Sequence, residues 1–532
     1  MFASLARNIV ITGIAYSVIS VVGLVLAPFL IGLYGLGGYG QILLARFLLP
    51  SASFGFLDLG IGETATRTIG VSRENGDWDH AASVLSLLCG MALSISAVTA
   101  LLMIATAHLL PGWMSIAPGQ SAGFTNVILL TAALQPVLFL SLVFEGVLKG
   151  FERFRRLRLC EISSSAVYAT LAVSFGLGGW GPNWVSVALL AGLTVRFVIV
   201  FLSALPLLRA AGVRLRGWTR ETRGDVLHWS LVMLANKTLG TLQTQAASPL
   251  IGLMLGPPAV GAFDAVVRLP RFAKSVFSLL SSTVLPVSAA LKARADANAL
   301  RLLGSYGILA ALTISLPPML FAMAYSHSFL KYWIGSAVVG FWGWQSAMFL
   351  VSMLNVAISF GGAILLADRD ASSTLNRLTF WQVAIQLVLS VALVPFFAQW
   401  AFVVGQVVSV ILLFPLQFAA VRRALGLGPD LLRQFLLLVA TAGVIALGLR
   451  LIIPNPSPVI LLLLGMVSVG LAWAVFPWVL LRDGERRALF DRLRARLGRA
   501  PASAETFPYP GTVDMLYEAP IKEGPKGPGH KG

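Results

Sequence analysis

Six basic residues lie inside stretches of the chain that are otherwise apolar enough to cross a membrane: Arg46, Arg196, Lys237, Arg268, Arg271 and Lys274. A cation near the centre of a bilayer costs about 2.5–3.5 kcal/mol on insertion scales, so such residues are rare and usually face a polar interior. Guanidinium and ammonium groups in that setting are suited to binding an anion through charge and hydrogen bonds. We therefore predict that these six residues line an anion-binding site.

A second interpretation of the same residues is that they reach the membrane surface. Long basic side chains near a helix end commonly extend their charged head into water. This is an open alternative for Arg46, which lies about two helical turns from the outer end of its predicted span. Arg196 and Lys237 lie about twelve residues into their predicted spans. At that depth the side chains reach the membrane surface less easily, so this interpretation is weaker for them.

Three of the six residues share one predicted span. Arg268, Arg271 and Lys274 are spaced i, i+3 and i+6, which spreads them over one broad helical face from about 10 Å to about 20 Å deep. Asp264 precedes Arg268 by one turn, a spacing that allows an ion pair. The other carboxylates within or beside spans fall near predicted cytoplasmic ends, where hydration is easy: Asp58, Glu63, Glu145 and Glu161. Since no carboxylate is predicted at mid-depth, the site should stay positive.

Composition excludes several classes of protein. The chain has 532 residues, of which 57% are hydrophobic and 11% charged, so it is a membrane protein with many spans. The net charge of +17 falls mostly in connections between spans, and we expect no nucleic-acid partner. No metal-ligand spacing and no phosphate-binding loop of the nucleotide-hydrolysing type occurs, so neither a metal nor a cofactor is expected.

Hydropathy predicts an all-α polytopic membrane protein with about fourteen helices, because a span needs about 20 apolar residues. Twelve remains an alternative count, since the fifth segment is short and rich in serine. The predicted spans are 11–33, 40–60, 80–106, 124–148, 161–179, 184–207, 226–252, 262–290, 302–325, 342–366, 377–397, 400–421, 432–453 and 458–480.

Basic residues in the connections predict the orientation. Lys and Arg gather in every second connection, as they do in cytoplasmic loops, and Lys331 and Arg450 are the exceptions. Both termini are therefore expected in the cytoplasm. A basic stretch over 482–499 with apolar residues at helical spacing predicts an amphipathic helix, and the Pro- and Gly-rich remainder from Pro501 is expected to be disordered.

An internal repeat divides the chain. Pro28-Phe-Leu-Ile-Gly-Leu matches Pro249-Leu-Ile-Gly-Leu, and Leu-Ala-Arg46-Phe-Leu matches Val-Val-Arg268-Leu-Pro, at offsets near 221 residues with a slip of one. Both halves hold six spans and so have the same orientation. We predict two six-helix lobes, 1–220 and 221–424, then two extra helices in 425–481 and a cytoplasmic tail in 482–532. The repeat also predicts that Arg46 and Arg268 are equivalent.

Two short motifs, one in each half, carry a family resemblance. These are Tyr34-Gly-Leu-Gly-Gly-Tyr-Gly40 with Phe54-Gly-Phe-Leu-Asp-Leu-Gly-Ile-Gly62 and Arg67, and Gly261-Ala-Phe-Asp-Ala-Val-Val-Arg268 with Val284-Leu-Pro-Val-Ser288. The chain resembles the polysaccharide transporters, the Wzx-type lipid-linked oligosaccharide flippases of the multidrug/oligosaccharidyl-lipid/polysaccharide exporter superfamily.

The resemblance implies function as well as fold. It implies two lobes that alternate access to a central site, and a polyprenyl-diphosphate-linked oligosaccharide of O-antigen, capsule or exopolysaccharide that moves to the outer leaflet of the bacterial inner membrane. Lipid-linked anionic glycan and membrane lipids are the expected partners, with polysaccharide-assembly proteins a further one. The chain is then a transporter and not an enzyme. A membrane-embedded glycan polymerase or ligase, a multidrug-type exporter and an inactive scaffold remain alternatives.

Overall fold

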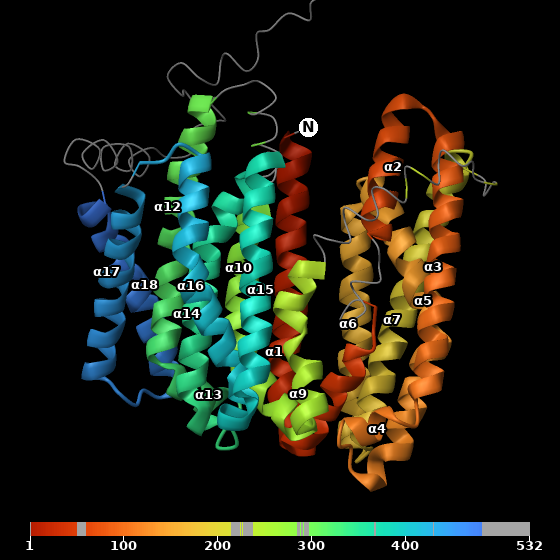
Figure 1. The fold of residues 1–532 in the computed structure, drawn as a ribbon, viewed down its shortest axis with the longest axis horizontal. Coiled ribbons are helices and arrows are strands. Elements are labelled where there is room, and N and C mark those ends of the chain that lie inside the picture. Colours follow the sequence, from red (N-terminus) through yellow and green to blue (C-terminus); the bar gives the residue numbers. More distant parts are fainter. Residues whose placement is uncertain are drawn as a thin grey trace, which may run out of the picture. The chain divides into compact units, whose positions relative to one another are not determined.

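The computed structural model describes residues 2–50, 60–213, 238–282, 297–365, 369–428 and 430–480, together with the single positions 217, 224, 226, 284, 288 and 291. Within them every regular element is a helix (Figure 1). The α-helices are α1 Phe2–Phe47, α2 Ile61–Asn75, α3 Trp78–Thr106, α4 Leu110–Trp113, α5 Pro118–Gly150, α6 Phe154–Leu177, α7 Pro182–Ala210, α9 Ala247–Leu255, α10 Pro257–Ser282, α12 Ala297–Ala324, α13 Ser326–Trp333, α14 Trp342–Leu365, α15 Arg369–Phe397, α16 Ala401–Ala424, α17 Asp430–Ile452 and α18 Pro458–Leu480.

Local sequence explains where several helices begin and end. Proline occupies the first position of α5 and α7, where its fixed φ suits a helix start and its missing N–H is not needed. Asp77 precedes α3 and accepts a hydrogen bond from the backbone N–H of His80 at 3.0 Å. α2 ends at Gly76, whose φ of 76° is the left-handed conformation that glycine adopts freely.

The all-helical class is confirmed within the described residues, but the number of membrane spans is not. Ten helical segments in the described residues are long and apolar enough to cross a membrane. One of these, Ser373–Ala424, contains most of α15 and all of α16. The second, seventh, eighth and tenth predicted spans include residues outside the described ranges, so fourteen stays a prediction. The 482–532 tail also lies outside those ranges.

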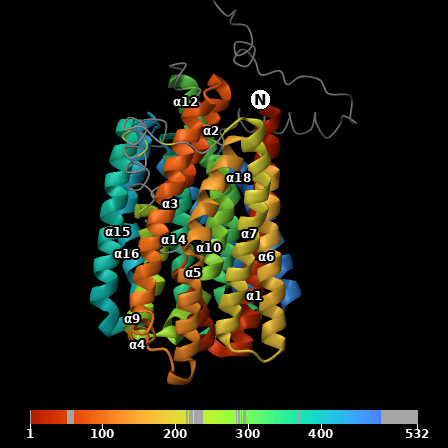
Figure 2. The ribbon, with the colours of Figure 1, turned by 90° about the vertical axis from the view of Figure 1, so that its right-hand side faces the viewer.

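The chain divides into two compact units, Met1–Phe476 and Pro477–Gly532. Within the first, α2, α3, α5, α6 and α7 pack against one another, and Figure 2 shows them side by side. A second group is formed by α10, α12, α14, α15 and α16. Helix α1 contacts α6 and α7 of the first group and α10 of the second, and it lies between the groups in Figure 1. The lobe boundaries proposed from the sequence stay predictions.

A pair of glycines repeats the same backbone bend in each half. Gly35 bends α1 with φ 64° and ψ −179°, and Gly256 separates α9 from α10 with φ 79° and ψ −179°. This region is essentially restricted to glycine. The positions differ by 221 residues (256 − 35), the offset that the repeat predicts. Gly35 therefore divides α1 into two helical parts, the first predicted span and the start of the second, as Gly256 divides α9 from α10.

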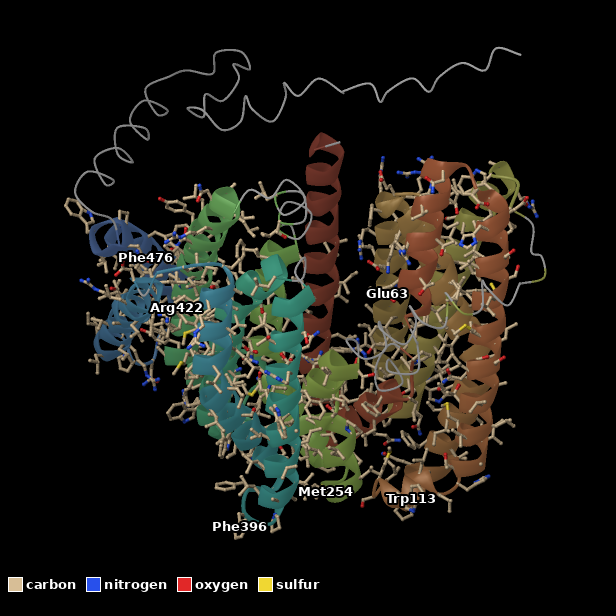
Figure 3. The ribbon with its side chains drawn as sticks, turned by 45° about the horizontal axis from the view of Figure 1, so that its top comes forward. Glu63, Trp113, Met254, Phe396, Arg422 and Phe476 are labelled. Atoms are coloured by element: carbon tan, nitrogen blue, oxygen red, sulfur yellow. The ribbon has the colours of Figure 1, made fainter. Side chains whose placement is uncertain are left out.

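Side chains distinguish the two ends of the first compact unit. Trp113, Met254 and Phe396 lie at one end, and Arg422 lies away from it (Figure 3). All three apolar side chains are exposed, whereas basic residues close the last turns of α2, α5, α7 and α16. This separation agrees with the basic ends facing the cytoplasm. Cytoplasmic termini stay a prediction.

Candidate anion-binding site

Arg268 lies at the contact between α10 and α1. Its Nε donates a hydrogen bond to Asp264 Oδ2 at 2.8 Å, its Nη2 lies 2.7 Å from the same oxygen, and its Nη1 donates to the Gly23 carbonyl of α1 at 3.0 Å. The predicted pair of Asp264 with Arg268 is confirmed. The guanidinium also lies 5.6 Å from the centre of the Tyr39 ring. Arg268 is therefore anchored to both helices.

Tyr39 completes this cluster from α1. Its hydroxyl donates a hydrogen bond to Asp264 Oδ2 at 2.6 Å, so one carboxylate oxygen is shared by Tyr39 and Arg268. Tyr39 is almost fully buried, and a buried hydroxyl needs such a partner. Because 225 residues separate Tyr39 from Asp264, spacing in the sequence gave no signal for the contact.

Arg271 and Lys274 continue along α10 from Arg268. Protein atoms surround all three side chains, yet each keeps part of its surface accessible to solvent. Arg271 lies over the Phe263 ring, 5.5 Å from its centre. Among the described residues neither Arg271 nor Lys274 forms an ion pair with a carboxylate. They are the cations of this helix that remain available to an anion.

Arg46 comes from the end of α1 and is exposed. In the part of the chain that the structure describes, no carboxylate pairs with it. Tyr168 of α6 is within electrostatic range of both Arg46 and Arg268. Arg271 and Lys274 follow Arg268 along α10, and Tyr168 relates Arg46 to Arg268. We call these four cations, with Tyr39 and Tyr168, the basic cluster.

The predicted equivalence of Arg46 and Arg268 includes a slip of one residue. With the offset of 221 shared by Gly35 and Gly256, Arg46 corresponds to Val267, which is 0% exposed. One residue turns a helix by about 100°. The equivalence of the two arginines therefore stays a prediction.

Arg196 has a different environment from the rest. Its Nη2 lies 2.8 Å from Glu145 Oε2 and 3.3 Å from Glu161 Oε1, and Arg158 Nη1 donates to Glu161 Oε2 at 2.5 Å. This network joins α5, α6 and α7, and it borders a cavity of about 70 Å³ lined by Glu145 and Arg196. The expectation that these two glutamates are simply hydrated is wrong, because both are buried.

The network changes the assignment of Arg196. Two carboxylates match the charges of Arg158 and Arg196, so the group carries no formal excess charge. Burial favours this arrangement, because an unpaired charge there is strongly destabilising. The observed geometry gives Arg196 a structural role in the first group of helices, although its role in anion binding stays untested. Lys237 lies outside the described residues.

No group of three or more His, Cys, Asp or Glu side chains within the described ranges is placed to hold a metal ion. The only carboxylate with a contact in the basic cluster is Asp264, among the residues that the structure describes. The cluster therefore has the chemistry of an anion-binding surface: four cationic side chains, one carboxylate and two tyrosine hydroxyls.

Comparisons with known proteins agree with this architecture. A family model described as "Polysaccharide biosynthesis protein" matches residues 5–292, more than half of the chain. No curated protein sequence matches.

Solved transporters share the fold at low sequence identity. The lipid II flippase MurJ, in an inward closed conformation, superposes with a TM-score of 0.70 at 13% identity, covering 88% of this chain and 99% of that one. An inward-facing multidrug resistance MATE transporter of the MOP superfamily gives 0.64 at 16% identity, covering 78% and 98%. A MOP superfamily transporter from Pyrococcus furiosus, described as having a binding pocket of reverse polarity, gives 0.55 at 17% identity, covering 80% and 95%.

Proposed function

Because the chain belongs to the polysaccharide biosynthesis protein family, we propose that it is a flippase that carries a polyprenyl-diphosphate-linked oligosaccharide across the bacterial inner membrane. The glycan would be a repeat unit of O-antigen, capsule or exopolysaccharide. The substrate's diphosphate would bind the basic cluster while its prenyl chain remains in the lipid.

The observation that carries this proposal is the charge of the basic cluster. Of its four cations only Arg268 has an ion pair with a carboxylate, Asp264, within the described residues; Arg46, Arg271 and Lys274 have none. Arginine offers a planar fork that binds phosphate oxygens in pairs, and lysine adds charge without that geometry. A diphosphate supplies both the negative charge and the oxygen atoms that such a set can bind.

The same charge separates this proposal from a multidrug-type exporter. A carrier of organic cations needs a carboxylate that is free to bind its cargo. In the part of the chain that the structure describes, the carboxylates placed deep among the helices already have basic partners: Asp264, Glu145 and Glu161. A glycan polymerase or ligase remains the second candidate, since arginines would bind the diphosphate of its donor too.

Transport itself distinguishes the flippase from that enzyme. We would reconstitute the purified chain into proteoliposomes containing a polyprenyl-diphosphate oligosaccharide and measure how much of it becomes accessible to a glycosidase added outside. We expect the accessible fraction to rise faster with the protein than in protein-free vesicles, with the oligosaccharide unchanged in length. Elongated glycan would identify a polymerase, and equal rates would exclude the flippase.

The basic cluster is tested in the same assay. Replacing Arg271 and Lys274 by Gln removes two cations that have no carboxylate partner among the described residues, and we expect at least a tenfold slower rate. Arg423→Gln is the matched control, because Arg423 is an exposed cation at the C-terminal end of α16. Normal transport by the double variant would remove the basic cluster from the mechanism.

A negatively charged cargo also has a defined relation to the membrane potential. Outward movement of each negative charge is favoured by about 2.3 kcal/mol per 100 mV when the inside is negative. Movement of the cationic helices with the cargo would reduce this gain. We therefore expect an imposed inside-negative potential to increase the rate.

A further inference from the structure

Two cations depart from the charge pattern of the connections, and both lie around α13. Lys331 is on α13, and Arg450 is in the last turn of α17. Tyr332 of α13 donates a hydrogen bond to the Pro456 carbonyl at 2.7 Å, which ties α13 to the connection between α17 and α18. Basic residues are disfavoured on the outer side. The presence of both Lys331 and Arg450 at the predicted outer end therefore needs an explanation.

A cavity of about 260 Å³ lies at this place. It is far larger than a single water molecule requires. Its lining combines charged, polar and aromatic groups: Ala324, Tyr325, His327, Ser328, Trp342, Arg450, Pro454 and Asn455. None of these is a carboxylate. The basic cluster contributes nothing to this lining, so we treat it as a separate site, the outer cavity.

Arg450 supplies the charge of the outer cavity. Its Nη1 donates to the Ala324 carbonyl at the end of α12, and its guanidinium lies 5.4 Å from the centre of the Trp342 ring. No carboxylate pairs with it among the residues that the structure describes. The hydrogen bond to the Ala324 carbonyl uses one of the five N–H donors of the Arg450 guanidinium. Its positive charge and the other donors remain available to a ligand.

Ser328 contributes a hydroxyl to the outer cavity. The residue is 4% exposed and lines the cavity. Its hydroxyl has no hydrogen-bond partner within the described ranges. A ligand oxygen in the cavity would therefore accept a hydrogen bond from Ser328 while it neutralises Arg450.

We propose that the outer cavity binds the phosphate group of a lipid headgroup. Arg450 provides charge and donors, Ser328, His327 and Asn455 provide further hydrogen bonds, and Trp342 offers the amphipathic ring that favours the membrane interface. The lipid is either a bulk anionic phospholipid or the polyprenyl phosphate end of the cargo. The second source rests on the proposed function, and the first does not.

The test measures lipid binding to the intact chain by native mass spectrometry. The probes are phosphatidylglycerol, polyprenyl monophosphate and monoglucosyl diacylglycerol, which lacks a phosphate. We expect Arg450→Gln to raise the Kd of at least one phosphate lipid fivefold or more and to leave the glycolipid unaffected. Arg423→Gln, at the opposite end of the bundle, is the matched control and should bind all three normally.

Because Arg450 also caps α12, Arg450→Gln could weaken binding by destabilising the fold. Two further variants separate these two effects. Arg450→Lys keeps the charge and should bind better than Arg450→Gln. Ser328→Ala removes a hydroxyl without a described partner, so it should weaken phosphate-lipid binding while the thermal unfolding midpoint holds. If the variants raise the Kd of polyprenyl monophosphate alone, the outer cavity binds the lipid of the cargo. If they raise the Kd of phosphatidylglycerol, the outer cavity binds bulk phospholipid. Unchanged Kd values for both phosphate lipids in folded Arg450→Gln and Ser328→Ala would overturn the proposal.

Discussion

Gly40 of α1 packs against the backbone of α10, and Gly261 of α10 packs against the backbone of α1 in the equivalent way. A Cβ built on Gly40 would lie 1.8 Å from the Pro257 carbonyl oxygen, and one built on Gly261 would lie 2.2 Å from the Leu36 carbonyl oxygen. Both glycines and both carbonyls are related by the offset of 221 residues. The two halves therefore meet backbone to backbone about a local two-fold relationship, which we call the glycine contact.

The first prediction concerns the glycine contact. Gly40→Ala and Gly261→Ala should each destabilise the protein by about 1–3 kcal/mol, because the added methyl must push a backbone carbonyl away. The double variant should lose transport. The measurement is the thermal unfolding midpoint in detergent together with the flipping rate. Gly32→Ala is the control on the same helix, since nothing lies within 4 Å of its Cβ, and its midpoint should change little.

The second prediction concerns the network around Arg196. Arg196→Met leaves Glu145 and Glu161 buried without their shared cation, so the free energy of unfolding should fall by about 3–5 kcal/mol. Adding Glu145→Gln should recover part of this loss, and a double-mutant cycle of unfolding midpoints measures the coupling. Arg209→Met, on the same helix but exposed, should be nearly neutral. A neutral Arg196→Met would contradict the structural role.

The third prediction concerns the arginines of the basic cluster. Arg46→Ala should abolish complementation of a strain lacking the gene, with protein levels unchanged. Arg268→Ala should abolish it too and should also lower the unfolding midpoint, because Asp264 then loses its cation. Lysine should restore only part of the activity, because it lacks the planar fork. Arg271 and Lys274 should tolerate exchange between Arg and Lys. Normal complementation by the Arg46→Ala/Arg268→Ala double variant would rule out their part in binding.

The fourth prediction concerns topology. Reporters fused after Arg216 and at the C-terminus should report cytoplasm, and one placed within 110–122 should report the outside. An external C-terminal reporter would mean that the span count is wrong by one. Removing the residues from Pro501 onward should leave transport largely intact, which the flipping assay measures on the truncated chain.

Local spacing predicted one ion pair within a helix, and it missed the pair of Arg158 with Glu161 on α6 and the contacts made between helices. Asp264 and Arg268 are one turn apart, so their ion pair follows from helical geometry. Arg196 lies 51 residues from Glu145 and 35 from Glu161, and only the packing of α5, α6 and α7 brings them together. Hydropathy placed the helices well, because membrane thickness sets their length. It could not reveal the backbone conformation of Gly35, which separates the first two predicted spans without a loop between them.

The hydrogen bond from Arg268 to the Gly23 carbonyl links occupancy of the basic cluster to the position of α1. An anion that takes this donor competes with the bond that fastens α10 to α1. The two effects are reciprocal. If the anion binds more tightly when that bond is broken, its binding shifts the equilibrium toward the broken state by the same free energy. If the cargo binds the basic cluster as proposed, an empty carrier would keep this bond and a loaded one would release it. The same guanidinium would then bind the cargo and suppress cycles without cargo.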